Sequence, residues 1–344
     1  MMNFNQVVVE KMAYSLPPHI VSSRELEGTL APLYQRLNLQ IGRLELMTGI
    51  EERRFWDSHQ QASQSSAEAG IKLLKEGEID PNAVDLLIHS AVCRDRLEPA
   101  TASYVHNLMG LGQNTQFLDV SNACLGFLNA LILGGSMIEQ GMIDRAIIVA
   151  GENGKPLVDE TVRLLNESKF DRKQIKPFFA NLTIGGGAVA WSICRENKTN
   201  SCLPRLSQFA SSTDTSHNKL CEGDQSMGGM LMQTDSEELL HAGIRVATHA
   251  WNNFLQVTNW NTQSPQLIVT HQVGKAHQQE IEKALGYDSR NSFNTYKSLG
   301  NCGSVSLPIT YTLACEQNKD FPQMKSALLG IGSGLSSLML ALNN

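Results

Sequence analysis

Seven cysteines are present in the chain, and one of them, Cys124, stands where a thiol could act as a nucleophile. A β-prone run ends at Val120, a small Ser-Asn-Ala turn follows, and Leu125 to Met137 is apolar on nearly every face, as a fully buried helix requires. This spacing predicts Cys124 in the first turn of the helix. Unpaired backbone N–H groups and the helix dipole would there lower the thiol pKa and polarise a thioester carbonyl. Most free cysteines are buried and inert, so the hypothesis needs partners for Cys124 elsewhere.

Two parts of the sequence repeat at a nearly constant offset, and the repeat supplies such partners. The string LLIHSAV from Leu86 matches LIVTHQV from Leu267, an offset of 181 residues. The string beginning at Cys124 matches the one beginning at Asn301, an offset of 177 residues. A duplicated βαβ-type unit predicts two helix N-termini that face each other across a pseudo-twofold axis. Cys124, His271 and Asn301 then all lie at strand-to-helix junctions, where open α/β sheets place their chemistry.

The rest of the chain alternates between strand and helix patterns, which indicates an α/β protein. Residues 83–92 and 144–154 are typical of buried strands, and the polar helical pattern at 155–180 indicates an excursion from the core. A chain of 344 residues is long enough for two domains. We expect these domains at residues 1–200, with the cysteine, and 201–344, with the histidine and asparagine.

The pattern around these three residues resembles the thiolase superfamily, in its ketosynthase III branch. In that family a Cys opening the buried helix, a His after a β-strand and an Asn in a G-N-x-G-like turn form a catalytic triad, and these fall on Cys124, His271 and Asn301. The match covers essentially the whole chain, including TGIEERR near the start and GIGSG near the end. The resemblance implies a thiolase fold, in which two duplicated βαβαβαββ halves form a five-layered αβαβα structure.

The same resemblance implies an acyltransferase that uses acyl-CoA as a substrate and needs no cofactor or metal. An acyl group would be transferred from a thioester to Cys124, with the oxyanion on the backbone N–H groups of Cys124 and of a residue near Ser333. A second thioester would then have its carbonyl oxygen held by His271 and Asn301 while negative charge builds on it.

Two further strings, CRDRLEPATAS and SNACLGFLNA, are similar to those of one subgroup of this branch. Its members condense two long-chain fatty acyl-CoAs without decarboxylation to a 2-alkyl-3-oxo acid, in the biosynthesis of long-chain olefins and hydrocarbons. In that subgroup the Glu of the LEP string reaches into the active site of the other subunit as a base, and that residue is Glu98 here. The resemblance therefore implies a homodimer, and downstream reductases or β-lactone-forming enzymes as partners.

Glu98 distinguishes this function from the alternative, a decarboxylating 3-oxoacyl-ACP synthase III that uses acyl-CoA and malonyl-ACP. Loss of CO₂ generates the carbanion in those enzymes, so they need no carboxylate base, whereas proton abstraction from an acyl-CoA does. Taken alone, Glu98 would be an ordinary surface glutamate. A rival from another class is a non-catalytic thiolase-fold subunit, whose signature is loss of the Cys or the His, and both are present.

Other residues give weaker signals. His277 is expected to be helical and exposed, without a role, and Asn301 outside the duplicated register would be an ordinary turn residue. A charged turn near the start could contact a CoA nucleotide or simply be solvated: Arg53, Arg54 and Trp56. Three methionines in a Gly-rich loop could adapt to an alkyl chain but are more often plain packing: Met227, Met230 and Met232.

Composition excludes several classes of protein. The net charge is −6 and no basic stripe is present, so nucleic acid is not expected as a partner. No two cysteines have zinc-site spacing, and the odd number favours a reducing compartment, so we expect a cytoplasmic protein. The N-terminus lacks a signal-peptide pattern, and glycines and serines interrupt the apolar C-terminal tail, so no membrane span is expected.

Overall fold

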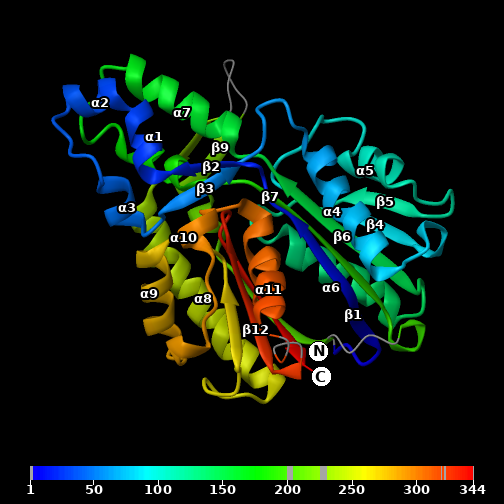
Figure 1. Cartoon of the computed structure of the whole chain (residues 1–344). Helices are drawn as coiled ribbons and strands as arrows, with labels where there is room; N and C mark the ends of the chain where they lie inside the picture. The colour runs from blue at the N-terminus through cyan, green and yellow to red at the C-terminus, as the bar shows by residue number, and fades with distance from the viewer. Residues whose placement is uncertain (1–2, 200–203, 225–230, 319, 321–322, 344) are drawn as a thin grey trace.

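Nine strands form one continuous sheet in the computed structural model, which describes all residues except 1–2, 200–203, 225–230, 319, 321–322 and 344 (Figure 1). The strand order is β11-β12-β13-β8-β1-β7-β6-β4-β5. The bounds of these strands are β1 (Val7–Ser15), β4 (Leu86–His89), β5 (Gln116–Asp119), β6 (Arg145–Glu152), β7 (Gly187–Arg195), β8 (Arg205–Thr213), β11 (Leu267–Thr270), β12 (Ser326–Gly332) and β13 (Ser336–Asn343).

The sheet consists of two halves with the same strand order. In the N-terminal half β4 is parallel to β5 and β6, and β7 runs antiparallel between β6 and β1. In the C-terminal half β11 is parallel to β12, and β13 runs antiparallel between β12 and β8. A parallel bridge between Ile268 and Ser292 stands where β5 stands in the first half, and the pair Val8–Arg205 joins the halves. The predicted domain division near residue 200 lies between β7 and β8 and stays a prediction.

Alternation along the strands produces the five layers that the resemblance implied. Ile148 faces the central core, whereas Ile147 and Val149 pack outward with residues of α4 and α5. In the second half Val269 faces the central core and Ile268 packs outward with residues of α8 and α9. The helices are α4 (Ala62–Gly77) and α5 (Thr101–Met109) on one outside, α6 (Gly126–Glu139) and α11 (Ser306–Gln317) in the centre, and α8 (Ser236–Thr258) and α9 (Lys275–Leu285) on the other outside.

The two central helices meet the same aromatic residue of the sheet. Phe127 of α6 and Tyr311 of α11 each lie with their ring centroid 5.5 Å from that of Trp191 in β7. The Trp191 indole N–H donates a 3.0 Å hydrogen bond to the Thr312 hydroxyl, so its polar atom is satisfied although the side chain is fully buried. A helix enclosed between the two halves of the sheet needs no polar face, which explains why the sequence of α6 is apolar on nearly every side.

A cap with its own apolar core covers one end of the layers, grouped at the upper left of Figure 1. Ser22 and Glu25 form a capping box at its first helix, with reciprocal bonds of 3.1 and 2.8 Å. The predicted excursion at 155–180 supplies the last two elements of the cap. Its elements are β2 (His19–Ser22), α1 (Ser23–Thr29), α2 (Ala31–Arg36), α3 (Arg43–Thr48), β3 (Glu52–Phe55), α7 (Lys155–Glu167) and η2 (Lys176–Thr183).

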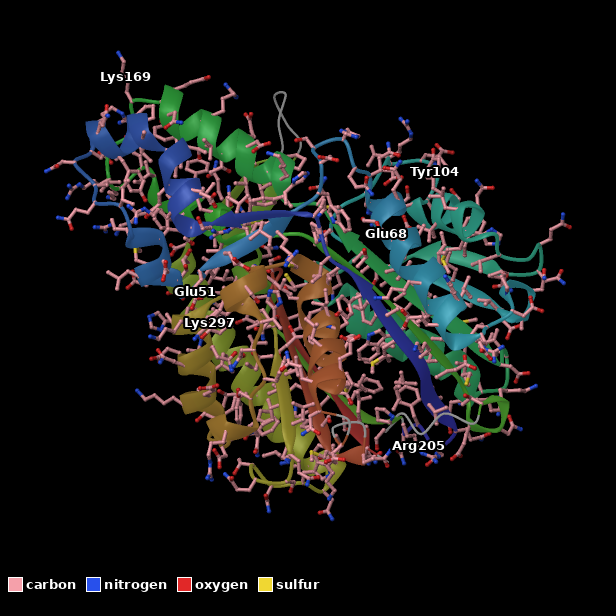
Figure 2. The ribbon with its side chains drawn as sticks, viewed as in Figure 1. Glu51, Glu68, Tyr104, Lys169, Arg205 and Lys297 are labelled. Atoms are coloured by element: carbon pink, nitrogen blue, oxygen red, sulfur yellow. The ribbon has the colours of Figure 1, made fainter. Side chains whose placement is uncertain are left out.

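The segment EERR is a strand and not a turn, which corrects the expectation from sequence. Arg53 is fully buried and donates to the Ser23 hydroxyl at 3.0 Å and the Leu182 carbonyl at 3.2 Å. Figure 2 labels the neighbouring Glu51 and Lys297, and the Glu51 N–H donates a 2.9 Å bond to the Lys297 carbonyl. The cap is thereby joined to α10 (Tyr296–Leu299), immediately before Asn301.

The remaining short elements connect these parts: η1 (Pro81–Ala83), η3 (Glu196–Lys198), η4 (Thr215–Leu220), β9 (Cys221–Asp224), β10 (Leu231–Thr234), η6 (Ser289–Asn291) and η7 (Gly303–Val305). In the described part of the chain, no helix combines the length and apolarity needed to cross a membrane.

Candidate active site

Cys124 lies in a tight turn between β5 and α6. The Leu125 N–H donates to the Asn122 carbonyl at 2.9 Å, and the Gly126 N–H donates to the Ala123 carbonyl at 3.3 Å. Ala123 has φ 44°, in the left-handed region that residues with a Cβ rarely adopt. A strained residue directly before a partly exposed cysteine is a feature typical of functional turns.

The surroundings of Cys124 raise the pKa of its thiol to about 12. Burial is the main cause, followed by the charge of Glu152 and then by Cys221. The expectation that the helix N-terminus lowers this pKa is therefore wrong in direction. Helix α6 begins at Gly126, beyond the cysteine, and loss of solvation is the largest cause of the raised thiol pKa. Cys124 is a neutral thiol at pH 7.

His271 directly follows β11, and its backbone N–H donates a 3.1 Å bond to the Leu329 carbonyl of β12. The side chain is buried, and its Nδ1 has no hydrogen-bond partner among the described residues. Burial, and secondly the nearby His277, lower the pKa of the imidazole to about 3. The ring is therefore neutral at pH 7, with one N–H to donate and one nitrogen to accept.

Asn301 is held by hydrogen bonds that orient its side-chain amide. Its Oδ1 accepts the Gly303 N–H at 3.0 Å and the Ser306 hydroxyl at 3.5 Å. Its backbone N–H donates to the Thr183 carbonyl, and its carbonyl accepts the Gly185 N–H, both at 2.9 Å. Because Oδ1 faces a backbone donor, Nδ2 is assigned as the free end of the amide and is available as a donor.

The turn that contains Ser333 lies against the start of α6. A Cβ on Gly332 would come 3.0 Å from Leu125 Cγ and 3.6 Å from the Leu125 backbone nitrogen, so only glycine allows this close approach. The same strand, β12, pairs with β11, which ends at His271. The residue after Cys124 thus lies against the turn that contains Ser333, and His271 follows the strand that pairs with β12. A backbone N–H of this turn is suitably placed to be tested as an oxyanion donor.

Glu98 is exposed in the long loop between β4 and α5. No hydrogen bond or ion pair joins it to any residue in the described ranges, and the preceding Leu97 is 98% exposed. A hydrogen bond fixes the loop three residues before Glu98, where Asp95 Oδ1 accepts the Ser63 N–H at 3.0 Å. Within one chain Glu98 is therefore exposed to solvent, and the joint action of Cys124, His271 and Asn301 stays a prediction.

A buried carboxylate that the sequence did not single out lies beside Cys124. Glu152 ends β6, is 4% exposed and accepts hydrogen bonds from Val92, Cys93 and Ser304. The sequence feature that could have identified Glu152 is its position at the carboxyl end of the buried strand AIIVAGE, where α/β sheets place polar functional residues.

Other expected residues occupy different surroundings from those predicted. His277 is half-buried in the first turn of α9, and burial lowers its pKa to about 4, so it is not the exposed residue expected. Arg53 and Trp56 are buried, which removes them as contacts for a CoA nucleotide, while Arg54 is half-buried and donates to the Pro17 carbonyl at 3.3 Å. Met232 is half-buried in β10, and two of the methionines lie outside the described residues: Met227 and Met230.

Comparisons with family models, with individual relatives and with solved structures all identify the same family. The family model of 3-oxoacyl-[acyl-carrier-protein (ACP)] synthase III matches residues 118–201, and the model of its C-terminal part matches residues 255–343. The chain is 36% identical to the acyl-CoA:acyl-CoA alkyltransferase of Shewanella oneidensis, over 99% of each chain, and 33% identical to that of Xanthomonas campestris, over 98% of each. Identity to a beta-ketoacyl-[acyl-carrier-protein] synthase III of Staphylococcus epidermidis is 22%, over 84% of this chain and 86% of the relative.

Solved structures agree with the sequence matches. Crystal structures of Xanthomonas campestris OleA superpose on the chain with TM-scores of 0.95 and 32% sequence identity, covering all of this chain and 98% of the OleA chain. They include variants in which a glutamate, a cysteine or a histidine is substituted, and a complex with cerulenin. The chain belongs to the OleA family of acyl-CoA:acyl-CoA alkyltransferases, within the ketosynthase III branch of the thiolase superfamily.

Proposed function

We propose that the protein joins two long-chain fatty acyl-CoAs head to head by a non-decarboxylative Claisen condensation. Overall, two acyl-CoA molecules and one water give a 2-alkyl-3-oxo acid and two free CoA thiols. The full-length identity to two acyl-CoA:acyl-CoA alkyltransferases supports this reaction class. The residues proposed to perform it are Cys124, His271, Asn301 and, from the partner subunit, Glu98.

In the first step Cys124 Sγ attacks the carbonyl carbon of one acyl-CoA. A carbon–sulfur bond forms to the enzyme, the bond to the CoA sulfur breaks, and the thiol proton leaves with the CoA thiol. Because the thiol pKa is raised, a base must carry this proton, and neutral His271 is available for that role. Backbone N–H groups of Cys124 and Ser333 are proposed to stabilise the tetrahedral oxyanion.

In the second step the second acyl-CoA loses a proton from its α-carbon to Glu98. The resulting enolate oxygen accepts hydrogen bonds from the His271 ring and from Asn301 Nδ2, the free donor of an amide whose oxygen is occupied. The α-carbon then attacks the acyl-Cys124 carbonyl, a carbon–carbon bond forms, and the Cys124 sulfur leaves and is reprotonated. The neutral imidazole has one ring N–H, and this is the donor that the enolate oxygen requires from His271.

Water then cleaves the remaining thioester and releases the 2-alkyl-3-oxo acid. A β-keto acid of this kind loses CO₂ readily, so an enzyme that reduces it or closes it to a β-lactone is the expected next step. We include these two downstream classes, and the cytoplasmic location expected from composition, as predictions.

A homodimer is part of the proposal because Glu98 is exposed and forms no hydrogen bond or ion pair with any described residue of its own chain. Six large apolar residues are exposed between residues 92 and 142, the part of the chain that contains Glu98: Val92, Leu97, Leu108, Phe117, Leu133 and Met142. Strand β5 of the same segment is at the end of the sheet order, and its first two residues are exposed. An apolar surface next to an open sheet edge favours association with another chain.

The observation that carries the choice of reaction is Glu98 itself. A carboxylate on a protruding loop, beside the fully exposed Leu97, has no use in a decarboxylating synthase but is required for abstraction of an α-proton. The second candidate, a decarboxylating 3-oxoacyl-ACP synthase III, is favoured only by the family models and by relatives of 22–24% identity.

Purified protein supplied with myristoyl-CoA as the only acyl donor separates the two candidates. Release of CoA, together with a ketone from the decarboxylated product, is expected. A strict need for a malonyl thioester would contradict the proposal. Cys124→Ala should abolish turnover, whereas the matched change of a buried cysteine in β7, Cys194→Ala, should leave it intact. Turnover by the Cys124→Ala protein would contradict both candidates, because each of them proceeds through an acyl-Cys124 intermediate.

A further inference from the structure

Glu152 is a buried carboxylate, and each of its two oxygens accepts at least one hydrogen bond. Oε1 accepts the Val92 N–H at 2.8 Å, the Ser304 hydroxyl at 2.7 Å and the Ser304 N–H at 3.2 Å. Oε2 accepts the Cys93 N–H at 3.0 Å. The side chain is 4% exposed, and within the described ranges no lysine, arginine or histidine forms an ion pair with it. Backbone amides and one hydroxyl therefore replace its hydration shell.

The donors to Glu152 belong to two segments that are far apart in the sequence. Val92 and Cys93 begin the loop that carries Glu98. Ser304 belongs to the turn after Asn301, in which the adjacent Gly303 N–H orients the Asn301 side-chain amide. One carboxylate thus fixes both the start of the Glu98 loop and the turn that presents Asn301.

The packing around this carboxylate leaves little freedom for either segment. Gly303 has φ +56°, and a Cβ on it would come 2.9 Å from Glu152 Oε1, so the turn lies directly on the carboxylate. The negative charge of Glu152 also raises the pKa of the Cys124 thiol. It belongs to the site although it has no role in the steps above.

We propose that Glu152 is a positioning residue that holds Asn301 in its own active site and, through the Val92–Cys93 amides, the Glu98 that the same chain lends to its partner. This inference rests on the proposed function, in which Glu98 acts across the dimer. It predicts that one protomer's Glu152 governs condensation in both active sites, and that it does so without governing acylation of the partner's cysteine.

Heterodimers with two different tags separate the two effects. The triad chain carries Glu98→Gln and keeps Cys124, and the base chain carries Cys124→Ala and keeps Glu98. The parental heterodimer therefore has one complete site, formed by the triad of the first chain and the carboxylate base of the second. Adding Glu152→Gln to the triad chain tests whether Glu152 positions Asn301. Adding it to the base chain tests whether Glu152 positions Glu98. Acyl-Cys124 is quantified by intact-protein mass spectrometry, and condensation by product formation from myristoyl-CoA.

We expect Glu152→Gln in either chain to slow condensation about 10- to 100-fold, since misplacement of a reacting group by about 1 Å has this effect. In the base chain it should leave the rate of acyl-Cys124 formation at the parental level. A merely structural role would lower both steps in proportion to the loss of folded protein. The amide introduced by Glu152→Gln presents N–H donors to backbone N–H donors, so one of the segments must be released.

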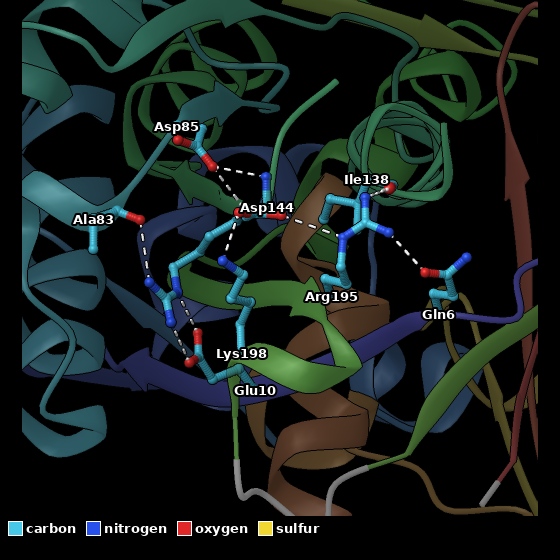
Figure 3. Close-up of polar contacts among 9 residues, drawn as sticks. Gln6, Glu10, Ala83, Asp85, Ile138, Asp144, Arg195 and Lys198 are labelled. Atoms are coloured by element: carbon cyan, nitrogen blue, oxygen red, sulfur yellow. Dashed lines mark hydrogen bonds and ion pairs between the residues drawn. The ribbon is translucent and has the colours of Figure 1, made fainter. Parts of the chain in front are cut away.

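Two further variants act as controls. Ser304→Ala removes the hydroxyl donor on the Asn301 side and keeps the Ser304 N–H, so it should slow condensation when placed in the triad chain and have no effect in the base chain. Glu10→Gln changes another partly buried carboxylate, which pairs with Arg145 in a cluster with Asp144, Arg195 and Lys198 nearby, and should leave both steps unchanged (Figure 3).

The inference is overturned if Glu152→Gln in the base chain leaves condensation at the parental rate, or if it slows acylation as much as condensation. An inactive parental heterodimer would contradict the partner-borne base of the proposed function and, with it, the part of this inference that concerns Glu98. In that case the Glu152→Gln homodimer still tests the hold on Asn301, and unchanged condensation there would overturn that part.

Discussion

The Gly303 N–H donates a 3.0 Å hydrogen bond to Asn301 Oδ1, and this bond decides which end of the Asn301 amide faces the substrate. Asn301→Asp keeps the acceptor and removes the free donor. We expect condensation to fall about 100- to 1,000-fold, as for loss of one oxyanion donor, while Cys124 is still acylated. Rapid-quench measurement of acyl-enzyme and product checks this. Equal loss of both steps would contradict the role of Asn301 as an enolate donor.

Glu98→Gln should stop the reaction after the first half. The amide cannot take the α-proton, so acyl-Cys124 should accumulate while condensation falls by about 100-fold or more. Intact-protein mass spectrometry after mixing with myristoyl-CoA measures the trapped intermediate. Glu237→Gln, a change of another exposed glutamate in α8, is the control and should react like the wild type. Full turnover by the Glu98→Gln protein would remove the base from the mechanism.

The direction of the pKa shift of the Cys124 thiol can be measured from the pH dependence of its alkylation. With a pKa of about 12, the thiolate fraction rises about tenfold for each pH unit between pH 7 and 9, so alkylation by iodoacetamide should increase without a plateau. Glu152→Gln removes a charge that raises this pKa, and should make alkylation faster at any fixed pH in this range. Labelling is quantified on the Cys124 peptide. A plateau near pH 7 would show a lowered pKa, as the helix dipole alone would give.

Ala123 stores strain next to the nucleophile. Its φ of 44° suits glycine, tolerates alanine at a cost and disfavours a β-branched residue. Ala123→Val should lower the free energy of unfolding by about 1–2 kcal/mol and slow acylation of Cys124. Ala123→Gly should leave the free energy of unfolding and the acylation rate close to those of the wild type. Urea unfolding and acyl-enzyme formation are the two measurements. A valine variant as stable and active as the wild type would show that the turn relaxes freely.

Much of the fold followed from two regularities in the sequence. The near-constant offset between the strings at Leu86 and Leu267 predicted two similar halves, and both halves have the same strand order. The absence of a polar face between Leu125 and Met137 predicted a helix in the middle of the layers, and α6 lies there. Burial follows patterns that repeat along the chain, so these features can be predicted from a single sequence.

The electrostatics of the site did not follow from the sequence, because they depend on burial by distant segments. The thiol pKa of Cys124 was expected to be lowered, yet loss of solvation and the charge of Glu152 raise it. His277 and Arg53 were expected at the surface, yet neighbouring elements cover them. The importance of Glu152 arises from donors that are 59 to 152 residues away in sequence, which no local pattern indicates.

The central claim is that both acyl chains come from acyl-CoA and that no carbon is lost before the new bond forms. Supplying [1-¹³C]myristoyl-CoA as the sole acyl donor tests it most directly, with the product analysed by mass spectrometry. We predict a 2-alkyl-3-oxo acid labelled at both its carboxyl and its keto carbon, which becomes a ketone with one label when CO₂ is lost. Product that forms only with a malonyl thioester, and that carries one labelled acyl unit, would contradict the account.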